Sequence, residues 1–240
     1  MRNVAALTKR ELLAYFLSPM AYVVLTVFLA LSGYVFFSAV SNTQEATLVP
    51  LFEFLFLLLL LISPMLTMRL FADEFQSGTI EPLLTAPVTA AEVVLSKYLA
   101  SLFFLLAMLV PTFVHAAVLF AFGTPDGGLV VAGYLGVFLL GGFFLAVGLV
   151  ASACVRSQVS AAVISIVVLL SLLVLPVVVP KGATGAVSDA VRTLCFTGHF
   201  EEFTRGIVDT RDVAYFLLGT AFCVFLTCVL VAVRRWKGAV

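Results

Sequence analysis

The side chains that could do chemistry in this chain are few, and they concentrate in one short acidic segment. The segment reads Asp73-Glu74-Phe75-Gln76-Ser77-Gly78-Thr79-Ile80-Glu81-Pro82-Leu83-Leu84-Thr85-Ala86-Pro87. We expect Gly78 to end one helix, Thr79 to cap a short second helix, and Pro87 to stop it. Three acids and no base stand beside apolar residues here. This pattern is typical of a surface that docks another protein, and a solvated loop lying against lipid is the alternative.

The sequence motifs of several enzyme classes are absent. None of the four lysines precedes Ser or Thr, which excludes an ATP-binding P-loop, and neither Gly-x-Ser nor His-Glu-x-x-His occurs. His199 and Glu202 are spaced to supply two metal ligands, but no third ligand is evident. We therefore expect this chain to have no catalytic residue and to bind no metal and no cofactor.

One histidine lies inside a long apolar stretch. Counted along a helix from Lys97, His115 is roughly 26 Å deeper and near the opposite membrane surface. An ionisable group in this position is a candidate for a substrate path, and a hydrogen bond between helices is the alternative. Glu53 opens the preceding apolar stretch at a similar level. The residues of the candidate substrate path are Glu53, His115, His199, Phe200 and Phe203.

The composition is that of a membrane protein. The chain has 240 residues, of which 63% are hydrophobic and 11% charged, with a mean hydropathy of +1.21 and no net charge. A soluble domain carries about 25% charged residues, so a soluble enzyme and a disordered chain are excluded, and a neutral chain has no nucleic-acid-binding surface. Only helices or closed barrels cross a bilayer, and these apolar runs lack the alternation of barrel strands.

Six apolar runs are long enough to span a bilayer as helices. They cover residues 20–40, 51–70, 98–122, 129–153, 160–179 and 213–233. The sequence Thr89-Ala90-Ala91-Glu92 has the pattern of a capping box and marks the start of the third span. The fold class is therefore predicted as an all-α polytopic membrane protein, with six transmembrane helices in a single domain of residues 1–240.

Basic residues predict the orientation of the spans. Nine of the 13 basic residues fall on one side: Arg2, Lys9, Arg10, Arg69, Lys97, Arg156, Arg234, Arg235 and Lys237. By the positive-inside rule this side is cytoplasmic. We expect a multi-pass protein of the plasma (inner) membrane with both termini in the cytoplasm.

Three segments outside the spans complete the predicted architecture. They are an interfacial helix at residues 1–18, a cytoplasmic loop at residues 73–89 and an external segment at residues 180–212. In the external segment Phe196, Phe200, Phe203 and Ile207 form one apolar stripe of a short interfacial or re-entrant helix. Glu201, Arg205 and Asp209 are each four residues apart and are expected to form a ladder of ion pairs.

The acidic segment also resembles a known family. Glu74, Gly78, Thr79, Ile80, Glu81, Leu83, Leu84 and Pro87, with Lys97 opening the next span, match the permease subunits of ABC-2-type exporters. The resemblance implies that this segment contains a coupling helix, which docks on a separate ATPase subunit through Glu74, Gly78, Thr79, Ile80, Glu81, Leu83 and Leu84. It further implies two ATPase copies that hold ATP and magnesium, and a second permease subunit that is identical or related.

A second resemblance concerns the external segment. Gly198-His199-Phe200-Glu201, Phe203, Arg205-Gly206-Ile207-Val208-Asp209, Arg211-Asp212-Val213 and Tyr215-Phe216 resemble the branch that includes gliding-motility-type permeases. The sequence thus predicts an exporter permease whose charge-poor spans suit an amphipathic or lipid-linked cargo, with lipid as its surroundings. The alternatives are a channel or secondary transporter that needs no ATPase, a purely structural subunit, and an intramembrane hydrolase built on His115 and Ser165.

Overall fold

The structure is a computed structural model that describes residues 2–43, 46–78, 89–178 and 195–237. Every regular element in these ranges is a helix. They are α1 (Arg2–Leu17), α2 (Pro19–Thr43), α3 (Val49–Ser77), α5 (Ala90–Leu109), η1 (Val110–Thr112), α6 (Phe113–Phe122), α7 (Gly127–Cys154), α8 (Gln158–Val178), α10 (Phe196–Thr204) and α11 (Thr210–Lys237). Six helical stretches are long and apolar enough to cross a membrane: α2, α3, α5 through α6, α7, α8 and α11. The predicted all-α polytopic fold with six spans is confirmed.

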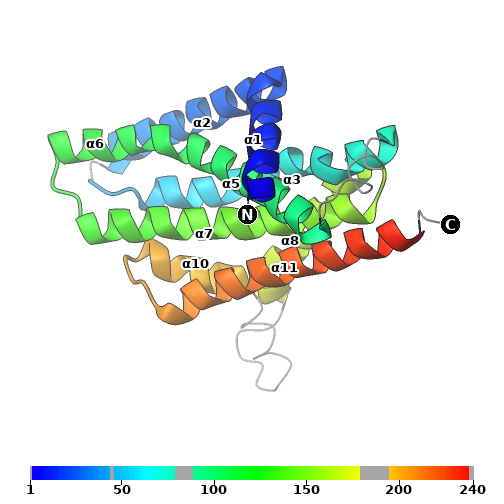
Figure 1. Cartoon of the computed structure of the whole chain (residues 1–240). Helices are drawn as coiled ribbons and strands as arrows, with labels where there is room; N and C mark the ends of the chain where they lie inside the picture. Colours follow the sequence, from blue (N-terminus) through cyan, green and yellow to red (C-terminus); the bar gives the residue numbers. More distant parts are fainter. Residues whose placement is uncertain (1, 44–45, 79–88, 179–194, 238–240) are drawn as a thin grey trace.

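The long helices run side by side around α7, while α1 crosses them steeply (Figure 1). α7 contacts α3, α5, α8, α10 and α11. Glycines on α7 allow this close approach, because a Cβ atom at Gly133 would lie 2.0 Å from the ring of Phe52 and one at Gly148 would lie 2.1 Å from Oγ1 of Thr67. In lipid the hydrophobic effect does not drive helices together, so their association depends on close packing, which small residues allow.

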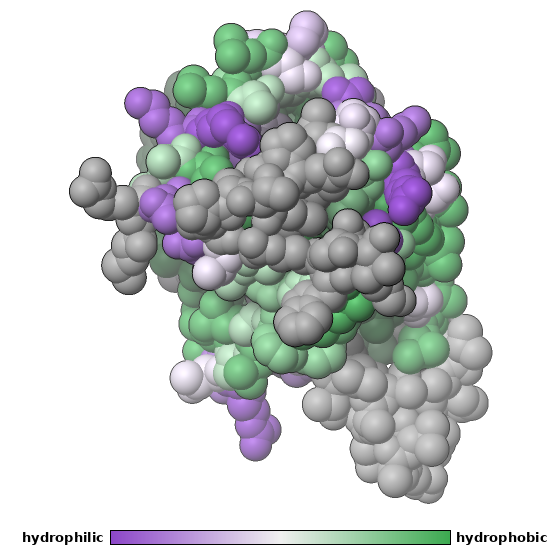
Figure 2. Space-filling model, turned by 45° about the vertical axis from the view of Figure 1, so that its right-hand side comes forward, coloured by the Kyte–Doolittle hydropathy of each residue, from purple (hydrophilic) through white to green (hydrophobic). Residues whose placement is uncertain are grey.

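The outer helices α2, α8 and α11 present apolar side chains outward. Val159, Val167, Phe222 and Phe225 are each more than half exposed. Figure 2 turns the right-hand side of Figure 1 forward and shows hydrophobic residues over much of the flanks, with hydrophilic residues mostly in the upper part of that view. Such a surface needs hydrocarbon around it, which agrees with spanning helices.

The second and third spans each contain a proline in their interior. Pro64 lies inside α3, and Pro111 lies in η1, which divides the third span into α5 and α6. A proline removes one backbone donor and crowds the preceding turn, so the helix must bend or change its hydrogen bonding there.

The short helix α10 ends earlier than its sequence pattern predicts. Phe196, Phe200 and Phe203 are buried as expected, but Ile207 is 52% exposed, so its place in the apolar stripe is wrong. Helix α10 ends at Thr204, and Gly206 turns the chain with a φ of +83°. The predicted apolar stripe and the predicted ladder of ion pairs both require a helix that continues through this turn.

The predicted ladder of ion pairs is only half present. Arg205 pairs with Glu201 one turn earlier on α10. Asp209 lies beyond the turn, where its Oδ1 accepts the backbone N–H of Arg211 at 2.9 Å and so caps the start of α11. The second rung is therefore wrong, because a change of backbone direction separates its members.

Candidate functional site

The two ends of the predicted coupling loop are well defined. α3 ends at Gly78, which adopts the left-handed conformation with a φ of +72°. α5 begins at a capping box in which Thr89 Oγ1 accepts the Glu92 N–H at 3.2 Å and Glu92 Oε2 accepts the Thr89 N–H at 2.9 Å. Both local predictions are confirmed. The candidate docking residues between these ends lie outside the described residues: Thr79, Ile80, Glu81, Leu83 and Leu84.

A buried ion pair joins the two helices that lead into this loop. The ammonium of Lys97 on α5 donates a hydrogen bond to Glu74 Oε1 at the end of α3, at 2.7 Å. The Lys97 side chain is only 2% exposed, and its ammonium lies 5.3 Å from the centre of the Phe71 ring. A charge buried this completely is tolerated only when it is paired. The pair therefore holds the end of α3 and the first turns of α5 together beside the loop.

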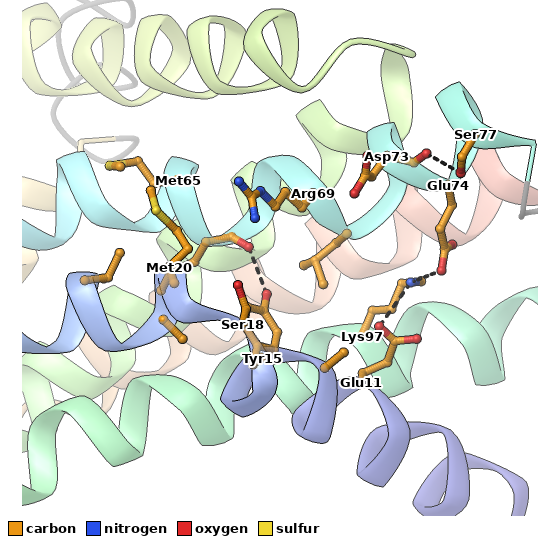
Figure 3. Close-up of a pocket in the computed structure, with 15 residues that line it drawn as sticks. Glu11, Tyr15, Ser18, Met20, Met65, Arg69, Asp73, Glu74, Ser77 and Lys97 are labelled. Atoms are coloured by element: carbon orange, nitrogen blue, oxygen red, sulfur yellow. Dashed lines mark hydrogen bonds and ion pairs between the residues drawn. The ribbon is translucent and has the colours of Figure 1, made fainter.

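The N-terminal helix contributes to the same cluster (Figure 3). Glu11 Oε2 on α1 lies 3.4 Å from the Lys97 ammonium, and Glu11 Oε1 accepts a hydrogen bond from Arg10 at 2.7 Å. Arg10 is also 4.0 Å from Glu74 Oε1. The hydrogen bond to Glu11 raises the pKa of Arg10, which keeps the guanidinium charged. Two cations and two anions thus balance, and we call Arg10, Glu11, Glu74 and Lys97 the charge cluster.

Tyr15 fastens α1 further. Its hydroxyl donates to the backbone carbonyl of Leu66 on α3 at 2.8 Å, and its ring stacks on Phe104 of α5 with 5.2 Å between centroids. Burial raises the pKa of Tyr15, so the hydroxyl keeps the proton that it donates. α1 is therefore attached to the bundle through both α3 and α5.

A serine of α7 contacts the backbone of α3 a few residues before Glu74. Ser152 Oγ accepts the N–H groups of Phe71 and Ala72 and donates to the carbonyl of Met68, each at 3.1 Å. Ser152 is fully buried. These three hydrogen bonds attach α7 to the backbone of α3 near the end of α3 that leads to the loop.

Sequence reasoning finds Glu74 and Gly78 but not the rest of this site. Lys97 serves there only as a boundary of the span, and Glu11 belongs to a polar turn without a stated partner. The sequence could have predicted an acidic partner for Lys97, because a lysine eight positions into an apolar helix requires a carboxylate nearby. No pattern in the sequence points to Tyr15 or Ser152.

The candidate substrate-path residues lie on three separate elements. Glu53 is exposed on α3, and the His115 ring on α6 packs on Phe36 with 4.8 Å between centroids. Phe200 and Phe203 of α10 are buried, and Phe200 stacks on Phe56 at 5.3 Å.

His199 is held by α11. Its Nδ1 lies 2.6 Å from Asp212 Oδ1, and its ring stacks on Tyr215 with 4.2 Å between centroids. The described residues contain no group of three or more side chains that could hold a metal ion.

Comparison with known proteins agrees with this architecture. Among curated proteins, none matches the sequence. A family model does match, that of the ABC-2 type transporter, over residues 2–207. The match covers most of the chain, from α1 to the turn after α10, and includes every residue of the charge cluster. The chain therefore belongs to the ABC-2 type transporter family, as a membrane-spanning permease component.

Proposed function

We propose that this chain is the permease subunit of an ATP-driven exporter, which couples ATP hydrolysis in a separate ATPase subunit to the export of a substrate. The observation that supports this most directly is the charge cluster. It ties the end of α3, the start of α5 and the N-terminal helix into one body on both sides of the loop. A force applied to residues 79–84 would therefore be transmitted to α1, α3 and α5 together.

The motor lies in the partner under this proposal. ATP and magnesium bind to two ATPase copies, since this chain lacks a P-loop. Closure of the two ATPases on ATP pushes on Glu81 and Leu84, and the charge cluster transmits the displacement into the spans. A second permease subunit, identical or related, completes the assembly.

The orientation follows from where the basic residues gather. Lys97 contacts Glu74 at the end of α3, Gln158 at the start of α8 donates to Asp73, and Arg234 near the end of α11 donates to the carbonyl of Cys154. These contacts put Lys97 and Arg234 at the same end of the bundle as the α7–α8 connection. By the positive-inside rule this end is cytoplasmic, with both termini there and the bundle in the plasma (inner) membrane.

The cargo class rests on the polarity of the interior. In the described spans most buried polar side chains away from the helix ends are hydroxyls, such as Ser32, Ser63, Thr67 and Ser165. The buried charge of Lys97 is balanced by Glu74 and Glu11. Ion filters and proton relays use charged groups at such depths. An amphipathic or lipid-linked cargo suits these spans better than an ion. From the sequence resemblance of residues 198–216, we further propose that the chain belongs to the gliding-motility-type branch.

Copurification tests the docking role. Glu81→Arg places a base in the acidic segment, and Leu84→Arg charges its apolar side, so each variant should lose the ATPase that copurifies with the wild-type chain. Glu202→Arg on α10, outside the docking segment, is the matched control and should retain it. Retention of the ATPase and of transport by both docking variants would contradict the proposal, as would transport by the purified chain without ATP.

A further inference from the structure

A cavity of about 320 Å³ lies between α3 and the elbow that joins α1 to α2 (Figure 3). One wall is apolar and comes from Met20, Ala21, Val24, Met65, Leu66 and Leu70. The other is polar and includes Ser18, Arg69, Asp73 and Ser77, with the charge cluster beside it. The cavity is thus amphipathic, and its polar wall is at the end of α3 that carries the charge cluster.

Two basic side chains line the cavity, and only one of them is paired with carboxylates. Lys97 is held by Glu74 and Glu11, so it has little attraction left for a ligand. Arg69 is exposed, and it forms no ion pair or hydrogen bond with any of the described residues. Arg69 is therefore the available cation of this cavity.

An available anion lies one helical turn away. Asp73 follows Arg69 by four residues on α3, so both side chains are on the same helix face. Asp73 Oδ1 accepts a hydrogen bond from Gln158 at 2.7 Å. A carboxylate has about four lone-pair sites on its two oxygens, so Asp73 can accept further donors. Arg69 and Asp73 thus offer one positive and one negative site on the polar wall of the cavity.

We propose that this cavity binds a phospholipid with an ethanolamine headgroup. Its phosphate pairs with the Arg69 guanidinium, and its ammonium donates to Asp73. One acyl chain lies against Met20, Val24 and Met65. Arginine suits phosphate because its planar fork donates two parallel hydrogen bonds.

Charge complementarity selects this occupant among membrane lipids. Phosphatidylglycerol would bring a net negative charge beside Asp73 without an ammonium group to pair with it. Phosphatidylcholine has a cation with no N–H group, so Asp73 would receive no hydrogen bond. A free phosphate would leave the apolar wall uncovered. The lipid site requires only that the helices span a membrane, and it stands whether or not an ATPase docks on the loop.

Native mass spectrometry of the purified full chain tests the headgroup. Delipidated protein is titrated with dioleoyl phosphatidylethanolamine, phosphatidylcholine or phosphatidylglycerol, and the first bound lipid is measured. We expect phosphatidylethanolamine to bind most tightly. Arg69→Gln should weaken it roughly tenfold, the size of one charged hydrogen bond. Asp73→Asn should reduce its preference over phosphatidylglycerol. Arg156→Gln, at an exposed base between α7 and α8, should change neither.

A photoreactive phosphatidylethanolamine with a diazirine in its acyl chain locates the site independently. Labelled peptides should include Met20, Val24 or Met65, and labelling there should fall in Arg69→Gln. Equal binding of the three lipids, unchanged binding by Arg69→Gln, or labelling confined to other helices would overturn the proposal. Melting temperatures of the variants in detergent show that a loss of binding does not come from unfolding.

Discussion

Replacing Lys97 by methionine is the most direct perturbation of the charge cluster. Methionine keeps the length and apolar stem of lysine but removes the ammonium that lies 2.7 Å from Glu74 and 3.4 Å from Glu11. Two carboxylates would then face each other in a largely buried place. We expect Lys97→Met to destabilise the fold and to loosen α1 and the start of α5.

The magnitude follows from the burial of the cluster. Removing one member of a buried ion pair costs about 3–5 kcal/mol, because it leaves an uncompensated charge. The Glu74 and Glu11 side chains are 19% and 13% exposed, and Arg10 stays near both, which reduces the cost. We therefore expect a loss of about 2–3 kcal/mol. In a chain of this size that corresponds to a fall in melting temperature of about 4–12 °C.

Thermal unfolding in detergent measures this effect. Lys9→Met is the matched control, since Lys9 is an exposed base on the same helix as Glu11 and should change the melting temperature little. Adding Glu74→Gln to Lys97→Met removes one of the stranded carboxylates and should recover part of the loss. If Lys97→Met melts like the wild type, or if the second substitution lowers stability further, the cluster does not hold these helices together as argued.

Three further predictions concern other contacts. Gly133→Ala should destabilise the bundle by about 1–3 kcal/mol in thermal unfolding, because its Cβ would overlap the Phe52 ring at 2.0 Å. Tyr15→Phe removes the hydroxyl that donates to Leu66 and should cost about 1 kcal/mol, with faster hydrogen exchange in α1. If an ATPase docks as proposed, His115→Ala should leave its stimulation intact, because the His115 ring packs on Phe36 of α2 and not on the charge cluster.

The first two of these predictions have controls in the same chain. Gly198→Ala should be tolerated, since nothing lies within 4 Å of the added Cβ, and equal losses at both glycines would contradict the packing argument. Tyr22→Phe alters an exposed ring and should leave exchange in α1 unchanged. A properly folded His115→Ala protein that no longer transports would place His115 on the substrate path.

Much of the architecture could be predicted because its causes are local. A run of about 20 apolar residues must become a helix in lipid, whatever surrounds it. The end of α3 at Gly78 and the start of α5 at Thr89 are likewise set by residues within one turn of each end. The turn at Gly206 was missed, because the apolar spacing continues to Ile207 although the helix does not.

The sequence by itself determined the number of spans, the helix ends at Gly78 and Thr89, and the side predicted to collect the basic residues. Only the tertiary structure decided that Lys97, Glu74 and Glu11 form one cluster and that Ser152 reaches the backbone of α3. Hydropathy and capping depend on neighbours along the chain, whereas an ion pair between helices depends on which faces meet. Lys97 needs an anion because of its own surroundings, but helix packing selects which carboxylate satisfies it.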